Sequence, residues 1–501
     1  MLEIKDLLFR IVSIPSINST HGEVEIAEFI YEYLRSLRDS FGVDNENFQV
    51  YLQDIRDDNL GRKNVIAVLK GNKEESNRCI VFVGHFDTVD IEDYGVLKDF
   101  AFDSVNLKSQ MKKIHPDLVV DNVEFGRGIL DMKAGIAVNI EVLKRFAQCV
   151  DKWSGYLVFL FVCDEEGDSK GMINSLYFLD KVKKEKSLDY LFCIDTDYSV
   201  NKAAYVGSIG KVLIGILVRG IETHVGQSLE GLNSNYILSY ILSKIEDNEY
   251  LVEDVASQFK TYPIIMKVRD MRDFYNVKTN LYSFAYINHL FYRDSIDQIV
   301  KKYVDLINSS IREMFLKRKK LMNFCDINYD LIRVHVLDDF SMDLYDCSRC
   351  DLLDVKDYRE NLIIFLKNRL DSYGINYPYV LVFLLPPYYP SVVSDLGIKS
   401  RLSEYIRGLG EDIEIYDYFP YISDLSFLGG LEGIEYLGRN MLGWGRYYYL
   451  DSEVMNNVKM PCINWGVIGY DAHKFTERLV VDYSLYRLPG YITDFVWGFL
   501  Q

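Results

Sequence analysis

The sequence has 501 residues, of which 49% are hydrophobic and 26% are charged, and its formal net charge is −18. A chain of this length exceeds one simple hydrophobic core, so we expect two domains or one domain with a large insertion. The acidic balance argues against a nucleic-acid partner, which would require a basic face. It favours solubility and a neutral or cationic small substrate.

The start of the chain is charged and indicates a helix rather than a secretory signal. The longest apolar runs, 155–163 and 379–386, are shorter than the roughly 20 residues that span a bilayer. The eight cysteines are scattered and several lie inside apolar strands, which is typical of reduced thiols in a cytoplasmic protein. We therefore expect a cytoplasmic protein without a membrane partner.

The first 207 residues predict helices that alternate with buried strands. The expected helices are 3–12, 22–38, 136–146 and 171–184, and the expected strands are 64–69, 79–84, 153–162 and 190–194. These strands are apolar on both faces, as parallel strands between two helical layers are. Residues 94–124 lack the pattern and predict an irregular, polar excursion.

From residue 208 the pattern changes to that of an α+β module. For residues 212–218 we expect a half-exposed strand of the antiparallel type. Further elements are expected at 235–245, 263–268, 278–288, 294–319 and 330–337. The α/β pattern then resumes with segments at 355–372, 379–385, 398–408 and from 482. We predict a discontinuous catalytic domain, 1–207 and 341–501, and an inserted domain, 208–340.

Histidine and acidic residues follow the ends of the predicted strands, where the loops of an open α/β sheet converge on one crevice. They are His85, Asp131, Glu165, Glu166, and Asp195 or Asp197. Carboxylates crowded together in this way repel each other strongly, and cations relieve the repulsion. The sequence therefore predicts a metal site at this edge of the sheet.

Two histidines, His85 and His473, complete the candidate donor set. Asp87 lies two residues after His85, so both side chains point to the same face and Asp87 can accept a hydrogen bond from the ring. Mixed nitrogen and oxygen ligation suits zinc, or cobalt or manganese in its place. In the adjacent pair Glu165-Glu166 the side chains diverge, so one can bind metal while the other acts as a general base.

Five blocks of the sequence carry a resemblance to a known family. They are Gly84-His-Phe-Asp-Thr-Val89, Gly126-Arg-Gly-Ile-Leu-Asp-Met-Lys-Ala-Gly135, Asp164-Glu-Glu-Gly167, Gly220-Ile-Glu-Thr-His-Val-Gly226 and Asp471-Ala-His-Lys474. In this order they resemble the co-catalytic zinc metallohydrolases of the aminoacylase, carboxypeptidase G and succinyl-diaminopimelate desuccinylase group. Within the group the chain is most similar to the RocB-like branch associated with arginine utilisation. The resemblance implies a mixed-sheet zinc-peptidase-like α/β domain with helices on both faces, and an inserted α+β lid and dimerisation domain.

The resemblance also implies a set of metal ligands. His85 and Glu166 would be terminal ligands, His473 would be a terminal ligand on the side of the second metal, and Asp131 would bridge two divalent ions, zinc first among them. Many relatives have Glu-Pro-Thr at the remaining ligand, where this chain has Asp195-Thr-Asp197-Tyr-Ser199. Aligning the last three residues favours Asp197, and counting from the strand favours Asp195. We take Asp197 as the expected ligand.

Catalytic roles follow from the same resemblance. Glu165 would activate the attacking water, Asp87 would orient His85, and a cis peptide bond would join Asp131 to Met132. His224 corresponds to a histidine that reaches the active site of a neighbouring subunit and donates a hydrogen bond to the oxyanion. We therefore expect a homodimer formed through the inserted domain.

The leading hypothesis is a metal-dependent amidohydrolase or peptidase acting on a small N-acyl amino acid or short peptide, with a role in arginine or ornithine catabolism. Two alternatives remain: a catalytically silent binding or regulatory protein, and a protein with a single or structural metal. We expect Lys133 and Arg127, which lie within four residues of Asp131 in the sequence, to neutralise local charge. Asp424 is expected either near the substrate pocket or as a loop cap.

Overall fold

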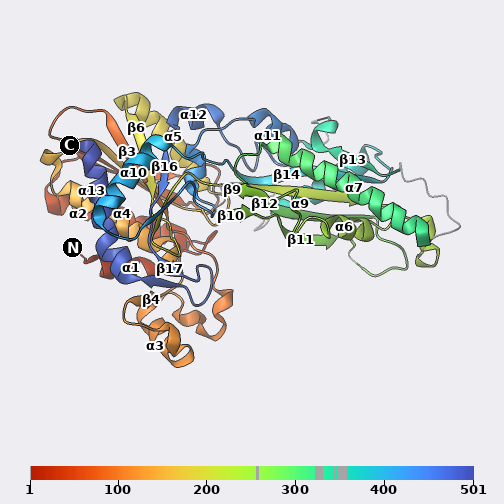
Figure 1. Ribbon diagram of the computed structural model, residues 1–501, viewed down its shortest axis with the longest axis horizontal. Coiled ribbons are helices and arrows are strands. Elements are labelled where there is room, and N and C mark those ends of the chain that lie inside the picture. Colours follow the sequence, from red (N-terminus) through yellow and green to blue (C-terminus); the bar gives the residue numbers. More distant parts are fainter. Residues whose placement is uncertain (1, 256–258, 273, 322–330, 342–344, 348–357) are drawn as a thin grey trace. The chain divides into compact units, whose positions relative to one another are not determined.

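The computed structural model describes residues 2–255, 259–272, 274–321, 331–341, 345–347 and 358–501, and the chain forms two compact units (Figure 1). Unit 1 comprises Met1–Ser208, Val392–Gly430 and Asp451–Gln501, and unit 2 comprises Ile209–Ser391 and Leu431–Leu450. The chain thus returns to unit 1 later than the expected residue 341. The reason is that the strand expected at 379–385 pairs within the sheet of unit 2. Parts of the two expected domains, 322–330, 342–344 and 348–357, lie outside the described residues, as does the start of the helix expected at 355–372.

Unit 1 is built on a mixed eight-stranded sheet with the order β1-β2-β5-β3-β6-β16-β7-β15. The strands are β1 (Phe48–Asp54), β2 (Lys63–Asn72), β5 (Ser154–Val162), β3 (Arg78–His85), β6 (Asp189–Asp195), β16 (Cys462–Asn464), β7 (Ala203–Val206) and β15 (Glu414–Tyr416). Strands β5, β3, β6 and β16 are parallel to one another, and β2 is antiparallel to β5. The mixed α/β sheet predicted from the sequence is confirmed. Strands β2 and β3 follow each other in the chain, but β5 lies between them in the sheet.

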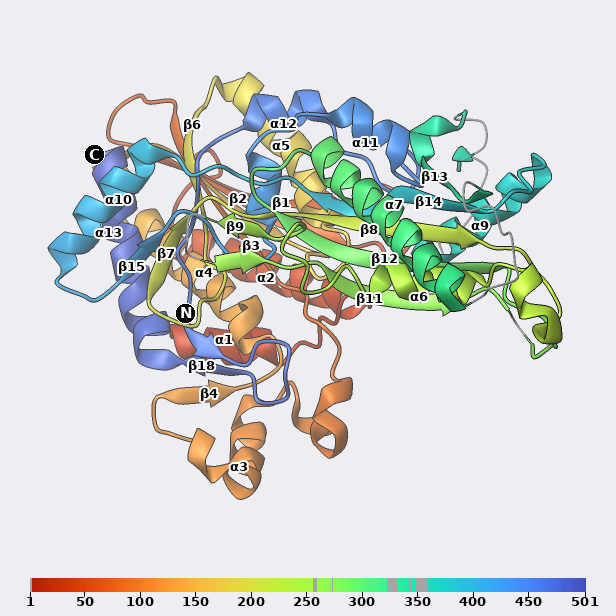
Figure 2. The ribbon, with the colours of Figure 1, turned by 45° about the vertical axis from the view of Figure 1, so that its right-hand side comes forward.

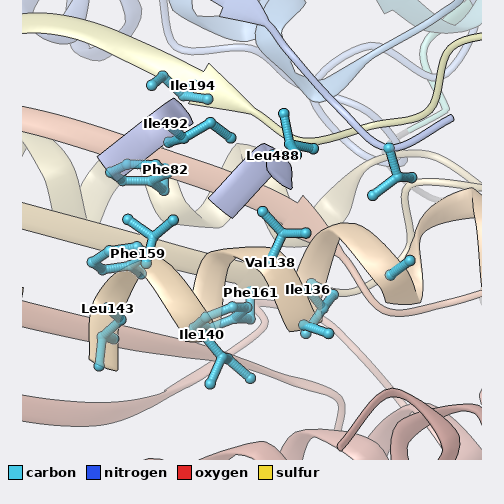
Figure 3. Packing of buried hydrophobic residues seen from close by; sticks show 14 of the residues in the cluster. Phe82, Ile136, Val138, Ile140, Leu143, Phe159, Phe161, Ile194, Leu488 and Ile492 are labelled. Atoms are coloured by element: carbon cyan, nitrogen blue, oxygen red, sulfur yellow. The ribbon is translucent and has the colours of Figure 1, made fainter. Parts of the chain in front are cut away.

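Helices cover the sheet on both faces. On one face lie α1 (Ile4–Val12), α2 (Gly22–Phe41), α4 (Ala134–Ala147), α10 (Leu396–Leu409) and α13 (Leu488–Leu500), whose buried residues share one core with the strands. Helix α5 (Lys170–Lys186) contacts β5 and β2 with residues outside that core, and α12 (Ser452–Val458) packs on α5 (Figure 2). In the core, Val138 and Leu143 of α4 face the phenylalanines of β3 and β5 (Figure 3).

Removing an aromatic ring from this core is expected to destabilise unit 1 strongly. Phe82 and Phe159 are fully buried, and their rings stack with centroids 4.5 Å apart. Phe159→Ala leaves a cavity that neighbouring strands cannot fill, so we expect a loss of about 3–5 kcal/mol in the free energy of unfolding. Urea denaturation followed by circular dichroism measures it. Val96→Ala is the control, because that side chain is 93% exposed and its loss should change stability by no more than about 0.5 kcal/mol.

The excursion expected to be irregular is largely helical. It contains η1 (Glu92–Phe100), α3 (Ser104–Ile114) and η2 (Pro116–Leu118), and these pack around a small apolar core. These helices were not predicted because only a few positions in α3 are buried, so the segment is mostly polar and shows little apolar periodicity. After it, β4 (Val123–Phe125) joins β18 (Arg478–Val480) and β17 (Gly469–Tyr470) in a three-stranded sheet.

Unit 2 is built on a five-stranded sheet with the order β11-β12-β8-β14-β13. Its strands are β11 (Ile264–Asp270), β12 (Tyr282–Phe291), β8 (Gly210–Arg219), β14 (Tyr379–Tyr389) and β13 (Arg333–Val336). Helix α9 (Tyr358–Ser372) packs with apolar residues of β8, β12 and β14. Helices α6 (Ser234–Leu242) and α7 (Ile296–Leu321) also contact this sheet. The inserted α+β unit is therefore present.

Strand β8 is antiparallel to both of its neighbours, as its pattern suggested, but nearly all of its residues are buried rather than half exposed. The reason is that residues 212–218 are all apolar or glycine and that helices α9 and α6 both pack on β8. Within the part of the chain that the structure describes, none of the helices is long and apolar enough to cross a membrane.

Candidate metal centre

The candidate residues of unit 1 follow the carboxyl ends of three adjacent parallel strands. His85 is the last residue of β3, Glu165 and Glu166 come after β5, and Asp195 is the last residue of β6. Parallel strands end at the same edge of the sheet. The loops that follow them therefore bring these side chains close together, although the residues are far apart in the sequence. The convergence predicted from the strand ends is present.

Asp131 lies in the turn η3 (Ile129–Lys133), which leads directly into helix α4. Gly128, before this turn, has φ 73°, a left-handed conformation that glycine adopts without cost. The peptide bond between Asp131 and Met132 is cis, so this prediction is confirmed. The Asp131 side chain is only 8% exposed.

Among the residues that the structure describes, two groups of potential ligands share Asp131. In the first, ligand atoms of His85, Asp131 and Asp197 all lie within 4.8 Å of one another, and the His85 Nε2–Asp131 Oδ1 distance is 3.1 Å. In the second, Nε2 of His473 lies 2.9 Å from both Asp131 Oδ2 and Glu166 Oε1. Because each oxygen of Asp131 faces a different histidine, its carboxylate is placed to bridge two ions.

Asp195 and Asp197 differ in what their carboxylates contact. Asp195 Oδ2 accepts a 2.7 Å hydrogen bond from the Ser423 hydroxyl, and its Oδ1 accepts from the backbone N–H of Asp197. Asp197 lies in the first cluster, with one of its oxygens accepting from the N–H of Tyr198. The geometry therefore favours Asp197 as a ligand and Asp195 as its support.

Asp87 connects His85 to the loop that carries the two glutamates. His85 Nδ1 lies 3.2 Å from the backbone oxygen of Asp87 and 3.5 Å from its Oδ1. The two carboxylate oxygens of Asp87 accept from the N–H groups of Glu165 and Glu166, at 3.1 and 3.0 Å. One buried carboxylate thus positions the ring and the glutamate loop together.

The glutamate side chains diverge, as expected for neighbours. Glu166 reaches His473, whereas Glu165 Oε2 lies 3.8 Å from His85 Nε2. Glu165 also lines a small pocket with His85, Asp195, Asp197 and Asp424. Asp424 is buried there rather than capping the loop, since the cap of η8 (Asp424–Leu428) is the preceding serine.

The electrostatics of the centre favour cations. Burial raises the pKa of Glu165 and Asp197 well above their usual range, and neighbouring carboxylates add to the effect. Burial disfavours the charged form of His473, yet hydrogen bonds to Asp131 and Glu166 raise its pKa to about 11. Divalent ions among these groups would relieve the repulsion between the carboxylates, so the residues present fit a metal pair.

His224 lies in unit 2, outside these clusters. It is exposed and precedes the turn η5 (Val225–Glu230), and its Nδ1 accepts a 3.1 Å hydrogen bond from the N–H of Gly226. A neutral ring that accepts at Nδ1 carries its proton at Nε2. His224 can therefore donate a hydrogen bond from Nε2.

Two residues that support the centre, Asn18 and Glu477, were missed from the sequence. The Asn18 amide donates to Asp87 and to Asp164. Glu477 accepts from the backbone of Asp131 and pairs with Arg127. Arg127 was expected to neutralise local charge, and its ion pairs with Glu477 and Asp93 do so. Glu477 lies four residues after His473 in the sequence, and this short spacing was the signal from which its place near the centre could have been inferred.

Comparisons with known proteins identify relatives of the chain. The profile of peptidase family M20/M25/M40 matches residues 81–457. Protein RocB of Bacillus subtilis (strain 168) is 29% identical over 99% of this chain and 95% of its own length.

Two solved structures show the same fold. The aminopeptidase PepT of Bacillus cereus ATCC 10987 matches with a TM-score of 0.57 and 13% identity, covering 99% of this chain and 97% of its own. The YXEP protein of Bacillus subtilis, described as a dinuclear metal binding peptidase, matches with a TM-score of 0.51 and 12% identity, again over 99% and 97%. Since the family profile covers more than half of the sequence, the chain belongs to peptidase family M20/M25/M40.

Proposed function

We propose that the protein is a two-metal amidohydrolase that cleaves an amide bond in a small N-acyl amino acid or a short peptide. The observation that carries the proposal is the pair of ligand clusters that share Asp131. Imidazole nitrogen and carboxylate oxygen together are donors that zinc accepts, and cobalt or manganese can replace it.

In this proposal His85 and Asp197 hold one ion, Glu166 and His473 hold the other, and Asp131 holds both. Two divalent ions, when bound, polarise the scissile carbonyl and lower the pKa of water toward ~7.

The remaining chemistry belongs to the protein's own carboxylates. Asp87 fixes the orientation of His85 and of the glutamate loop. Glu165 takes a proton from the attacking water at a carboxylate oxygen and delivers it to the leaving amine, so that it acts first as base and then as acid.

Metal analysis tests the ligand assignment. We expect about two zinc-like ions per wild-type chain, because two ligand groups are present. Asp197→Asn removes a charged ligand from the His85 cluster and should lower the content to about one ion. Asp195→Asn is the matched control and should keep both, since its carboxylate is engaged with Ser423. If Asp195→Asn lost an ion and Asp197→Asn did not, Asp195 would be the ligand and Asp197 the supporting residue. A wild-type protein with a single ion would contradict a dinuclear centre.

The substrate class is tested by a hydrolysis screen of N-acyl amino acids and dipeptides with zinc, cobalt and manganese. The similarity to protein RocB over nearly the whole chain supports a place in arginine or ornithine catabolism. We therefore expect faster hydrolysis of arginine and ornithine derivatives than of their norleucine counterparts, which have a neutral side chain. Equal rates would contradict this role, and no turnover of any substrate by a protein with both ions bound would favour a silent binding protein.

A homodimer through unit 2 forms part of the proposal. Strand β11 is at the edge of the five-stranded sheet, where its outer backbone groups can pair with another strand. Its residues Ile264, Met266 and Val268 are each about half exposed, at 48%, 59% and 54%. Sedimentation analysis of the full chain tests the dimer.

A further inference from the structure

The loop that carries His473 has little regular structure to hold it in place. It connects β17, which has two residues, to β18, which has three. Asp471 and His473 both have positive φ, and the His473 side chain is 48% exposed. Within the loop, Arg478 and Thr476 bind Asp471 and close the turn. These contacts lie within the loop, and the loop reaches the carboxylate of Asp131, the ligand that both clusters share, through the His473 ring.

Glu477 also connects the loop to the backbone of Asp131. It is fully buried, and its Oε1 accepts hydrogen bonds from the backbone N–H groups of Leu130, at 3.0 Å, and Asp131, at 3.3 Å. Its Oε2 accepts from Arg127 Nη1 at 2.8 Å. A residue of the His473 loop is therefore bonded to the backbone on which the shared carboxylate stands.

Arg127 anchors the other end of the link. It is 1% exposed, and besides Glu477 it donates to Asp93 Oδ1 at 2.6 Å and to the backbone oxygen of Asp90 at 3.0 Å. A buried ion pair is tolerated when its remaining hydrogen-bonding groups are satisfied, and such a satisfied network permits one geometry. The network therefore ties the His473 loop, the η3 turn and the excursion at Asp93 into one arrangement.

We propose that Glu477 is a positioning residue for the second ion, and this inference rests on the two-metal function proposed above. Glu477 sets the distance between Asp131 and His473, both of which belong to the cluster with Glu166. The cluster of His85 and Asp197 also contains Asp131, but its other two residues lie at the end of β3 and just after β6, and none of its residues is on the His473 loop. Loss of the Glu477 link should therefore weaken one ion selectively.

The test is titration of EDTA-treated, full-length protein with Co²⁺, followed by calorimetry and by the visible absorption spectrum of bound Co²⁺. Glu477→Gln keeps the shape of the side chain but removes the charge that pairs with Arg127. We expect one ion to bind with nearly wild-type affinity and the other to bind about 10–100-fold more weakly, the usual effect of losing a partner behind a metal ligand. The absorption spectrum of the variant should then differ from that of the wild type only during addition of the second equivalent of Co²⁺.

Glu124→Gln is the matched control. Glu124 is a buried carboxylate of β4, opposite Leu479 of β18, and it pairs with Lys5 and Lys108. Its loss disturbs the same small sheet without touching Asp131 or His473, so both ions should bind as in the wild type.

Wild-type binding of both ions by Glu477→Gln would overturn the proposal, and so would an equal loss of both. If Glu477→Gln does not fold, the Arg127→Met/Glu477→Met double variant replaces the buried pair with apolar side chains of similar volume, a change that often preserves folding. The same selective loss is expected from it, and two tightly bound ions would overturn the proposal. A wild-type protein that binds one ion or none would instead contradict the two-metal function itself.

Discussion

Glu165→Gln is expected to lower turnover by roughly 10²–10⁴-fold, because glutamine has the shape of glutamate but cannot take a proton from water. Metal content should stay near that of the wild type, since Glu165 lies outside both ligand clusters. The measurement is kcat on the best amide substrate from the screen, with metal analysis of the same preparation.

Glu166→Gln is the matched control for this result. Glu166 lies 2.9 Å from Nε2 of His473 and belongs to the second cluster. The same chemical change one residue along the chain should therefore lower the metal content. If Glu165→Gln lost an ion while Glu166→Gln kept both, Glu165 would be the metal ligand and Glu166 the base.

His224→Ala is expected to lower kcat by about 10²–10³-fold, the usual cost of losing one donor to the oxyanion. In the structure its Nδ1 is engaged by Gly226, which leaves Nε2 to donate. Metal content should not change, because His224 is absent from both clusters. The variant is assayed at saturating substrate, with metal analysis in parallel.

Mixing the two inactive variants tests whether His224 acts on a neighbouring subunit. A hybrid dimer of Glu165→Gln and His224→Ala contains one site in which Glu165 and the His224 of the partner subunit are both intact. Random exchange should restore roughly a quarter of the wild-type activity, because half of the dimers are hybrid and each has one complete site. Failure to restore activity, with subunit exchange shown by a label, would contradict the shared site.

Much of the fold could be predicted because its signals are local. The helix expected at 136–146 is α4, and the strand expected at 153–162 is β5. Helix α3 was missed because it is mostly exposed and polar, so it has little apolar periodicity. The insertion of β5 between β2 and β3 could not be predicted, since pairing joins residues far apart in the chain.

The second domain boundary was misplaced for the same reason. An apolar strand such as β14 fits either sheet by its own pattern, and its partner decides the domain to which it belongs. That partner is β8, more than 150 residues earlier in the chain.

The sequence by itself determined the residue types of the candidate centre and their positions after strand ends, because these depend on local pattern and spacing. Only the tertiary structure decided which side chains meet. It placed Asp197 in a ligand cluster and Asp195 against Ser423, although both follow the same strand. It also brought Glu477 to the backbone of Asp131, 346 residues away. Side-chain direction and long-range packing set such contacts, and neither is encoded in the spacing of residues along the chain.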